Sequence, residues 1–294
     1  MKVLDLKSGF YAGLILLALT ASLPANAWVK TLSFDDGVLG GKSVGEDAYS
    51  GSTASTYDNA HVFGDSGQSS KQYIQEGKTA YGVWGGVITL PEPAVEGQEV
   101  WVRVRTYYPS NFTFDANPHL KFIRFHTRSD TRSNGGYNDW YIDIDNPNNP
   151  FFYIYEGTMF IEGDNKKRRH YFGSWDTDRP QHEVWETYEM YVRFGSKSTD
   201  TGGLGLVRMW QNGRLVGEFS NEPTLFSADA YSSRIHLFTY WNGGAPATQN
   251  MWVDDVILTN EQPEERDANG NSLIGTGGYM PVNRPMPPQN IVTQ

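Results

Sequence analysis

The chain has 294 residues, of which 38% are hydrophobic, 14% aromatic and 20% charged, and it contains no cysteine. The lack of cysteine excludes disulfide scaffolds, cysteine-ligated metal sites and thiol catalysis, and the high aromatic content excludes an intrinsically disordered chain. A formal charge of -10 and an isoelectric point near 5.1 disfavour a nucleic-acid partner, because nucleic-acid binders are usually basic.

The N-terminal segment has the pattern of a signal peptide. Lys2 and Lys7 precede a short apolar run from Phe10 to Leu23, and Pro24–Ala27 supplies the small residues that signal peptidase cleaves. The run is shorter than the roughly 18 apolar residues of a membrane-spanning helix, which is the alternative interpretation. The sequence therefore predicts that residues 1–27 are removed and that the protein is secreted or periplasmic in a bacterium, without a membrane anchor after cleavage.

Residues 28–260 show little helical periodicity. Short runs rich in β-branched and aromatic residues recur between turns, and they predict strands. Asn212-Gly213 predicts a two-residue hairpin turn. In chain order the predicted strands are 31–34, 71–75, 82–89, 99–107, 120–127, 137–144, 151–155, 186–194, 205–211, 214–218, 233–240 and 251–258. This pattern predicts one all-β domain, an antiparallel β-sandwich of the jelly-roll type.

The composition changes after Asn260. Residues 261–294 hold five prolines together with glycine and asparagine, and they lack periodic hydrophobicity. Such a segment is an extended tail that either wraps around the domain or leaves it.

The strand at 120–128 has cations on one face. Alternation places Arg124, His126 and Arg128 together and Lys121 on the opposite face, unless a β-bulge intervenes. A row of like charges on a sheet repels itself, so it indicates an anionic ligand; a solvated face with neighbouring carboxylates is the alternative. A second basic run, at 166–170, extends this local excess of positive charge.

The strand at 233–241 alternates as well. It places Arg234, His236, Phe238 and Tyr240 on one face and Ile235, Leu237, Thr239 and Trp241 on the other. Tyrosine and tryptophan rings stack on sugar rings because both faces are apolar. Tyr153 and Tyr155 share a face of an earlier strand, and in a chain with 17 tyrosines each is a candidate for the core as well as for a ligand site.

Two pairs of aspartates lie near the two ends of the domain. They are Asp35-Asp36 and Asp254-Asp255. The first and last strands of a sandwich are often neighbours, and carboxylates brought together favour a bound cation such as Ca²⁺. The sequence thus suggests a structural Ca²⁺ held by some of these four residues, with turn or strand-end aspartates as the alternative, and no organic cofactor.

Several motifs resemble a known family. FDDG (34–37), LVRMWQNGRLVGE (206–218) and MWVDDVIL (251–258) resemble the concanavalin A-like, or laminin G-like, jelly roll. Together with LKFIRFHTR (120–128) and the late His236-x-x-x-Tyr240 pattern, they resemble the jelly-roll polysaccharide lyases of the alginate, glucuronan and heparin lyase I type. The resemblance covers residues 28–260.

The resemblance implies β-elimination in a uronic-acid polysaccharide, which would be an anionic partner, by a protein expected to be a monomer. One group neutralises the C5 carboxylate, a base removes the C5 proton, and an acid protonates O4. We therefore expect Arg124 to clamp the carboxylate, His126 to act as neutraliser or base, and Tyr240 to act as base or acid. Further candidates for substrate binding are Lys121, Arg128, Tyr153, Tyr155, His236 and Trp241, with His119 and Asn138 as weaker ones.

Two other functions fit the same sequence. A non-catalytic carbohydrate-binding domain would use the same aromatic and basic groups, since fold does not dictate function. A glycoside hydrolase would need two nearby carboxylates, and Asp139, Asp143 and Asp145 share one face of the strand at 137–144 and its continuation.

Overall fold

A computed structural model describes residues 26–45, 49, 54–79, 84–114, 119–143, 153–161, 164–174 and 176–277. Residues 1–25, most of the predicted signal peptide, and 278–294, the end of the predicted tail, lie outside the described residues. So does Asp145. The signal peptide therefore stays a prediction.

The larger of two antiparallel sheets has eight strands. Its order is β12-β11-β10-β5-β14-β3-β2, with β1 also paired to β14. The strands are β1 (Val29–Leu32), β2 (Ser55–Asp58), β3 (Ser69–Ile74), β5 (Glu99–Tyr107), β10 (Trp185–Arg193), β11 (Leu206–Gln211), β12 (Arg214–Phe219) and β14 (Gln249–Thr259).

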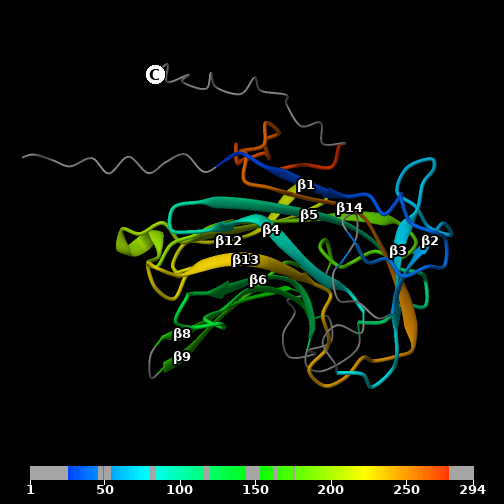
Figure 1. Ribbon diagram of the computed structural model, residues 1–294, viewed down its shortest axis with the longest axis horizontal. Coiled ribbons are helices and arrows are strands. Elements are labelled where there is room, and N and C mark those ends of the chain that lie inside the picture. Colours follow the sequence, from blue (N-terminus) through cyan, green and yellow to red (C-terminus); the bar gives the residue numbers. More distant parts are fainter. Residues whose placement is uncertain are drawn as a thin grey trace, which may run out of the picture.

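The smaller sheet has six strands in the order β4-β13-β6-β7-β8-β9. These are β4 (Gly86–Ala94), β6 (Leu120–Arg128), β7 (Gly136–Ile142), β8 (Tyr153–Ile161), β9 (Asp164–Phe172) and β13 (Tyr231–Leu237). Figure 1 shows the two sheets as stacked layers. The predicted all-β sandwich is confirmed, and β2 and β9 are strands that the sequence pattern did not predict.

Alternation along the strands builds one hydrophobic core between the sheets. The inward side chains of both sheets interdigitate there, as in other sandwiches; Phe122, Trp140 and Tyr188 pack edge to face at its centre. The outward face of the smaller sheet is left to polar and charged side chains.

The loops follow the turn chemistry of the sequence. Asn212 and Gly213 both have positive φ angles, 50° and 78°, between β11 and β12, so the predicted Asn-Gly hairpin is confirmed. Among the described residues the only helix is a 3₁₀ turn, Thr199–Thr201, and none is long enough to cross a membrane.

Residues 261–277 pack against the domain. Figure 1 shows this segment, in orange and red, on the side of the larger sheet that faces away from the smaller sheet. Leu273 and Ile274 join a second hydrophobic cluster there with Trp101, Tyr191, Trp210 and Ile257. Residues 261–277 of the predicted tail therefore wrap around the domain rather than leaving it.

Candidate functional site

A β-bulge in β6 decides which side chains reach the outer face of the smaller sheet. The register between β6 and β7 shifts between Lys121 and Ile123. Phe122 and Ile123 therefore both enter the core, and Lys121 comes onto the same face as Arg124. Simple alternation would have separated the two cations. The sequence placed Lys121 opposite Arg124 unless a β-bulge intervened, and the structure contains that bulge.

Tyr240 reaches the same place from the end of β13. Phe238 has a positive φ of 50° and turns its ring into the core, so the expectation that Phe238 shares a face with Tyr240 is wrong. Backbone hydrogen bonds from Thr239 N to Lys121 O (3.0 Å) and from Lys121 N to Tyr240 O (3.1 Å) continue the pairing beyond the strand. The two elements thus hold Lys121 and Tyr240 side by side.

The Lys121 and Tyr240 side chains are in direct contact. The Lys121 ammonium donates a hydrogen bond of 2.7 Å to the Tyr240 hydroxyl, and it lies 4.2 Å from the centre of the phenol ring. A cation at this distance stabilises negative charge on the phenol oxygen. The pair therefore combines a proton-transfer group with a positive charge.

A polar cavity of about 500 Å³ surrounds this pair. Its size lies within the range of roughly 300–1,000 Å³ that is usual for ligand sites. It is formed by β6, β7, β8 and β9 and by the chain on either side of them. The lining residues are His119, Lys121, Arg124, Asn134, Tyr137, Asp139, Tyr141, Glu156, Thr158, Phe160, Arg169, Tyr240 and Asn242.

Arg124 lines the cavity but already has a carboxylate partner. Its Nε lies 2.8 Å from Asp139 Oδ1, and Tyr141 donates a hydrogen bond of 2.6 Å to the other oxygen of Asp139. Arg124 as a whole residue is 4% exposed, and its guanidinium lies 4.0 Å from the centre of the Tyr137 ring. Arg124 is thus a buried structural cation. The expectation that it is free to bind a substrate carboxylate is wrong, because Asp139 already occupies its guanidinium.

The remaining charges of the cavity are paired as well, with one exception. Arg169, from β9, binds Glu156 through Nη2 at 2.7 Å, and His119 contacts Asp143 at 2.9 Å. Within the described part of the chain, Lys121 is the cavity cation that makes no ion pair with a carboxylate. An incoming anionic group would therefore meet Lys121 first.

His126 lies beside the cavity rather than in its lining. Its ring stacks on His236, with ring centres 5.7 Å apart and planes at 7°, and it contacts the Tyr137 ring edge-on. Burial, helped by the charges of Arg234 and Arg124, lowers the pKa of His126 to about 4. His126 is therefore neutral at neutral pH, and neutralising a carboxylate by charge is not open to it.

The lowered pKa of His126 predicts acid sensitivity of the fold. Between about pH 6.5 and pH 4 the unfolded chain binds a proton at this residue and the folded chain does not, so the free energy of unfolding falls as the pH falls. We expect a loss of about 2 kcal/mol between pH 7 and pH 4.5 from this residue. Urea unfolding of His126→Gln should show a weaker pH dependence than the unmodified protein, and an identical dependence would contradict this account.

The structure places three of the other predicted binding residues in the core. Tyr153, Tyr155 and Trp241 are fully buried. The Tyr153 hydroxyl donates to the Asp178 carbonyl, and the Tyr155 hydroxyl donates to Asn138, which is itself buried. These residues cannot contact a ligand, and their predicted role in substrate binding is corrected: alternation from Glu156, which faces the cavity, sends both tyrosines inward.

In the basic run at 166–170, the side chains that the structure describes are those of Arg168, Arg169 and His170, and they point to both faces of the strand. Arg168 and His170 point away from the cavity and both bind Glu222, at 2.7 Å each. Arg169, between them, lines the cavity. Arg128, at the end of β6, lies against the ring of Tyr231 outside the cavity.

The aspartate pairs do not act as one group of four. Asp255 accepts hydrogen bonds from Arg103 and Arg105. Asp254 instead accepts from the backbone N–H groups of Phe63 and Asp255. Burial raises the pKa of Asp254 to about 7, with a contribution from the neighbouring carboxylates of Asp255 and Asp35. Within the described ranges, no three acidic or histidine side chains are placed to hold a metal ion.

About half of the residues that line the cavity were not predicted from the sequence. Tyr137 and Tyr141 share the face of Asp139 on β7, and Glu156 and Arg169 come from β8 and β9. Alternation around Asp139 indicated the first two. Arg169 belongs to the basic run at 166–170 that the sequence already indicated. Glu156 lies one residue beyond the predicted strand at 151–155, and it faces the cavity because β8 pairs with β7.

Solved structures with a similar architecture include polysaccharide lyases and a carbohydrate recognition domain, that of Emp47p. The alginate lyase vAL-1 from Chlorella virus is 14% identical, with a TM-score of 0.51 over 70% of this chain and 89% of that one. The alginate lyase Aly36B is 12% identical, with a TM-score of 0.53 over 78% and 96%. The endo-β-1,4-glucuronan lyase from the fungus Trichoderma reesei is 12% identical, with a TM-score of 0.48 over 71% and 87%.

The fold is that of the jelly-roll polysaccharide lyases. The resemblance expected from the sequence motifs is thereby confirmed at the level of the fold. No protein-family model and no curated protein sequence matches the chain. At identities of 9–14% the likeness concerns architecture, so the activity has to be argued from the cavity itself.

Proposed function

We propose that the protein is a polysaccharide lyase that cleaves a uronic-acid polysaccharide by β-elimination. The observation that carries the proposal is the contact between Lys121 and Tyr240, 2.7 Å apart in a polar cavity on the outer face of the smaller sheet. Solved alginate lyases that share the fold support it. The neighbouring ion pairs hold the rest of the cavity rigid and leave Lys121 for the substrate.

The chemistry divides between these two side chains. Tyr240, as phenolate stabilised by the Lys121 ammonium, takes the proton from C5 of the uronate. The C5–H electron pair becomes the C4–C5 double bond, the C4–O4 bond breaks, and the phenol now formed on Tyr240 returns a proton to O4. Lys121 also faces the negative charge that develops on the substrate carboxylate, and such preorganised electrostatic stabilisation is a major term in catalysis. Tyr240 is thus acid and base in turn.

The other cavity residues bind and position. Asn134 and Asn242 offer amide groups for a carboxylate or for hydroxyls, and Tyr137 offers a ring edge and a hydroxyl. Arg124 fixes Asp139 and, with Thr239 at 3.4 Å, ties β7 to the turn that carries Tyr240. Arg124 is therefore a positioning residue in this proposal.

The test is incubation of the purified protein with alginate, glucuronan, hyaluronan, chondroitin and heparin. We expect the ultraviolet absorbance of an unsaturated uronate to rise with at least one of them. Binding to a polyuronate without any product would favour a carbohydrate-binding module, and silence on all five in both assays would overturn the proposal.

The structure gives little support to a glycoside hydrolase. Asp139 and Glu156 are cross-strand neighbours in the cavity, but each is neutralised by an arginine, at 2.8 Å and 2.7 Å. A hydrolase needs two carboxyl groups that are available to the glycosidic bond, and both of these are already engaged in ion pairs. Asp143 is engaged with His119.

Two further parts of the proposal rest on the sequence. The signal-like residues 1–27 support export to the periplasm or the medium, where polysaccharides are met. A structural Ca²⁺ would be bound by Asp35 and Asp254 rather than by Asp255, because Asp255 is engaged by two arginines.

The calcium prediction can be tested by melting. We expect millimolar Ca²⁺ to raise the melting temperature by several degrees over that in chelator, since a ligand that binds only the folded state stabilises it. Asp35→Asn should remove the effect, and Mg²⁺ should not reproduce it. Equal melting temperatures in Ca²⁺ and chelator would remove the metal from the account.

A further inference from the structure

A second polar pocket lies on the outer face of the larger sheet, on the opposite side of the sandwich from the Lys121–Tyr240 cavity. Its volume is about 550 Å³, and it is walled by β2, β3, the start of β14 and the loop at Leu39 and Gly40. Asn250 pairs with Tyr73 and Trp252 with Lys71 in the strand register. These neighbouring strands therefore present their outward side chains to one pocket.

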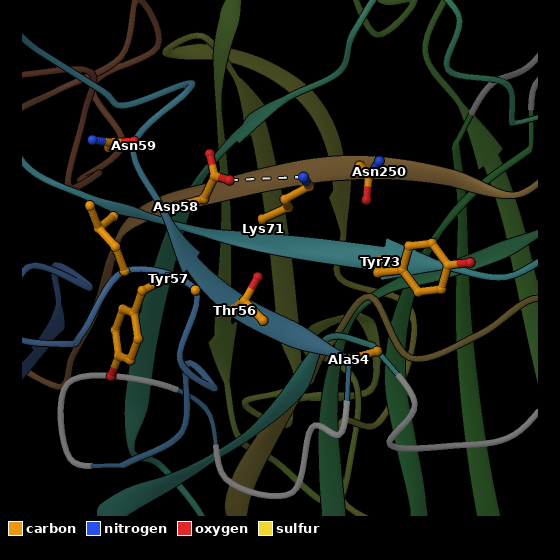
Figure 2. A pocket seen from close by; sticks show the side chains of 10 residues that line it. Ala54, Thr56, Tyr57, Asp58, Asn59, Lys71, Tyr73 and Asn250 are labelled. Carbon is orange, nitrogen blue, oxygen red and sulfur yellow. Dashed lines mark ion pairs between the residues drawn. The ribbon is translucent and has the colours of Figure 1, made fainter.

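Tyr73 supplies an open aromatic face. Its side chain is 46% exposed, and Figure 2 shows its ring at the far end of the pocket from Asp58, clear of the other labelled side chains. The nearby Trp252 is not available in this way, because His61 packs on it at 4.4 Å and it is 6% exposed. Tyr73 is thus the stacking surface of this pocket.

The polar groups of the pocket are held in place. Asp58 accepts hydrogen bonds from Trp252 Nε1 (3.0 Å) and from the backbone N–H of Ala60 (2.7 Å). Its second oxygen lies 3.8 Å from the Lys71 ammonium, as the dashed line in Figure 2 shows. The carboxylate and the ammonium are therefore oriented but only partly satisfied, with exposures of 22% and 33%.

Asn250 adds an acceptor without a partner. Its side-chain oxygen is shielded from solvent and makes no hydrogen bond within the described residues. A buried polar atom in this state costs free energy unless a partner is supplied. Figure 2 places Asn250 beside Lys71, between Asp58 and Tyr73, where a hydroxyl group of a ligand could donate to it.

We propose that this pocket is a second, non-catalytic saccharide site that binds a neutral hexopyranose unit. A pyranose ring has an apolar C–H face that matches the ring of Tyr73, and its hydroxyls can both donate to Asp58 and Asn250 and accept from Lys71. Lys71 and Asp58 cancel each other's charge, which favours an uncharged sugar over a uronate. The site would hold a neutral part of a polysaccharide while the opposite face acts on an acidic one.

Binding can be measured by calorimetry with cellohexaose and mannohexaose as probes. We expect at least one of them to bind, and we expect Tyr73→Ala to weaken its Kd about tenfold or more, the loss of one aromatic stacking contact. Tyr73→Phe keeps the ring and should keep most of the affinity, whereas Asn250→Ala should weaken it. Leu204→Ala, at an exposed site in the loop between β10 and β11, is the control that should leave Kd unchanged.

The result is independent of the lyase proposal. If the protein binds a neutral probe through Tyr73 but cleaves no polyuronate, the lyase proposal is wrong and the proposal of a second saccharide site stands. Conversely, polyuronate cleavage with no detectable binding of either neutral probe, or with binding unchanged in Tyr73→Ala, would overturn the second site.

Discussion

Replacing Tyr240 by phenylalanine should lower kcat on the polyuronate substrate by at least about 10²–10³-fold, the usual contribution of a general acid–base group. The change removes one oxygen atom and keeps the ring. That oxygen accepts the hydrogen bond from Lys121 and is the atom that would carry the proton between C5 and O4. KM should change much less than kcat, because the ring contacts remain.

A matched control separates catalysis from general effects on the sheet. Tyr231 lies on β13, and its ring packs with Arg128 outside the cavity. Tyr231→Phe should retain full activity. Tyr240→Phe should melt at nearly the same temperature as the unmodified protein, since Lys121 stays partly exposed to water. If Tyr240→Phe keeps its activity while cleavage is observed, Tyr240 is not the proton-transfer group.

The sequence predicted the sandwich because alternation is a local property. Strands such as β5 and β10 carry inward hydrophobic side chains at every second position, and Asn212-Gly213 defines its hairpin by backbone preference alone. The strand β9 was missed because DNKKRRHYF has little hydrophobic pattern. Its strand conformation comes from pairing with β8, which is a tertiary interaction.

The site was predicted less well, for the same reason. Two local irregularities, the bulge after Lys121 and the positive φ of Phe238, change which side chains share a face. They bring Lys121 to Tyr240 and bury Phe238. The ion-pair partners of the cations could not be predicted either, because they lie on neighbouring strands. Asp139 binds Arg124 across a strand pair, so the predicted substrate clamp is a structural ion pair.

Removing the segment after Asn260 should destabilise the protein strongly. Glu189 is fully buried and accepts hydrogen bonds from the backbone N–H groups of Ile274 (2.6 Å) and Gly275 (3.0 Å). Arg103, also buried, donates to the carbonyls of Gly275 and Gly277. A chain ending at Asn260 loses all four of these hydrogen bonds, and each hydrogen bond typically contributes about 0.5–1.5 kcal/mol, or more when one partner is charged.

Lost hydrophobic burial adds to this effect. Leu273 and Ile274 cover Trp101, Tyr191 and Trp210, and each buried aliphatic side chain contributes roughly 1.5–3 kcal/mol. We expect the free energy of unfolding to fall by at least about 4 kcal/mol, which corresponds to a melting temperature lower by roughly 10 °C for a domain of this size. Urea unfolding and thermal melting measure the two quantities.

A chain ending at Gly277 is the matched control. It keeps Leu273, Ile274 and the carbonyls that Arg103 contacts, so it should be more stable than the chain ending at Asn260 by the amount given above. The Glu189→Ala variant should reproduce part of the loss, because it leaves two buried N–H groups without an acceptor. Because the segment packs on the larger sheet and the cavity lies on the smaller one, the shortened chain should still cleave substrate below its melting temperature. Equal stability of the chains ending at Asn260 and at Gly277 would show that residues 261–277 are not part of the folded unit.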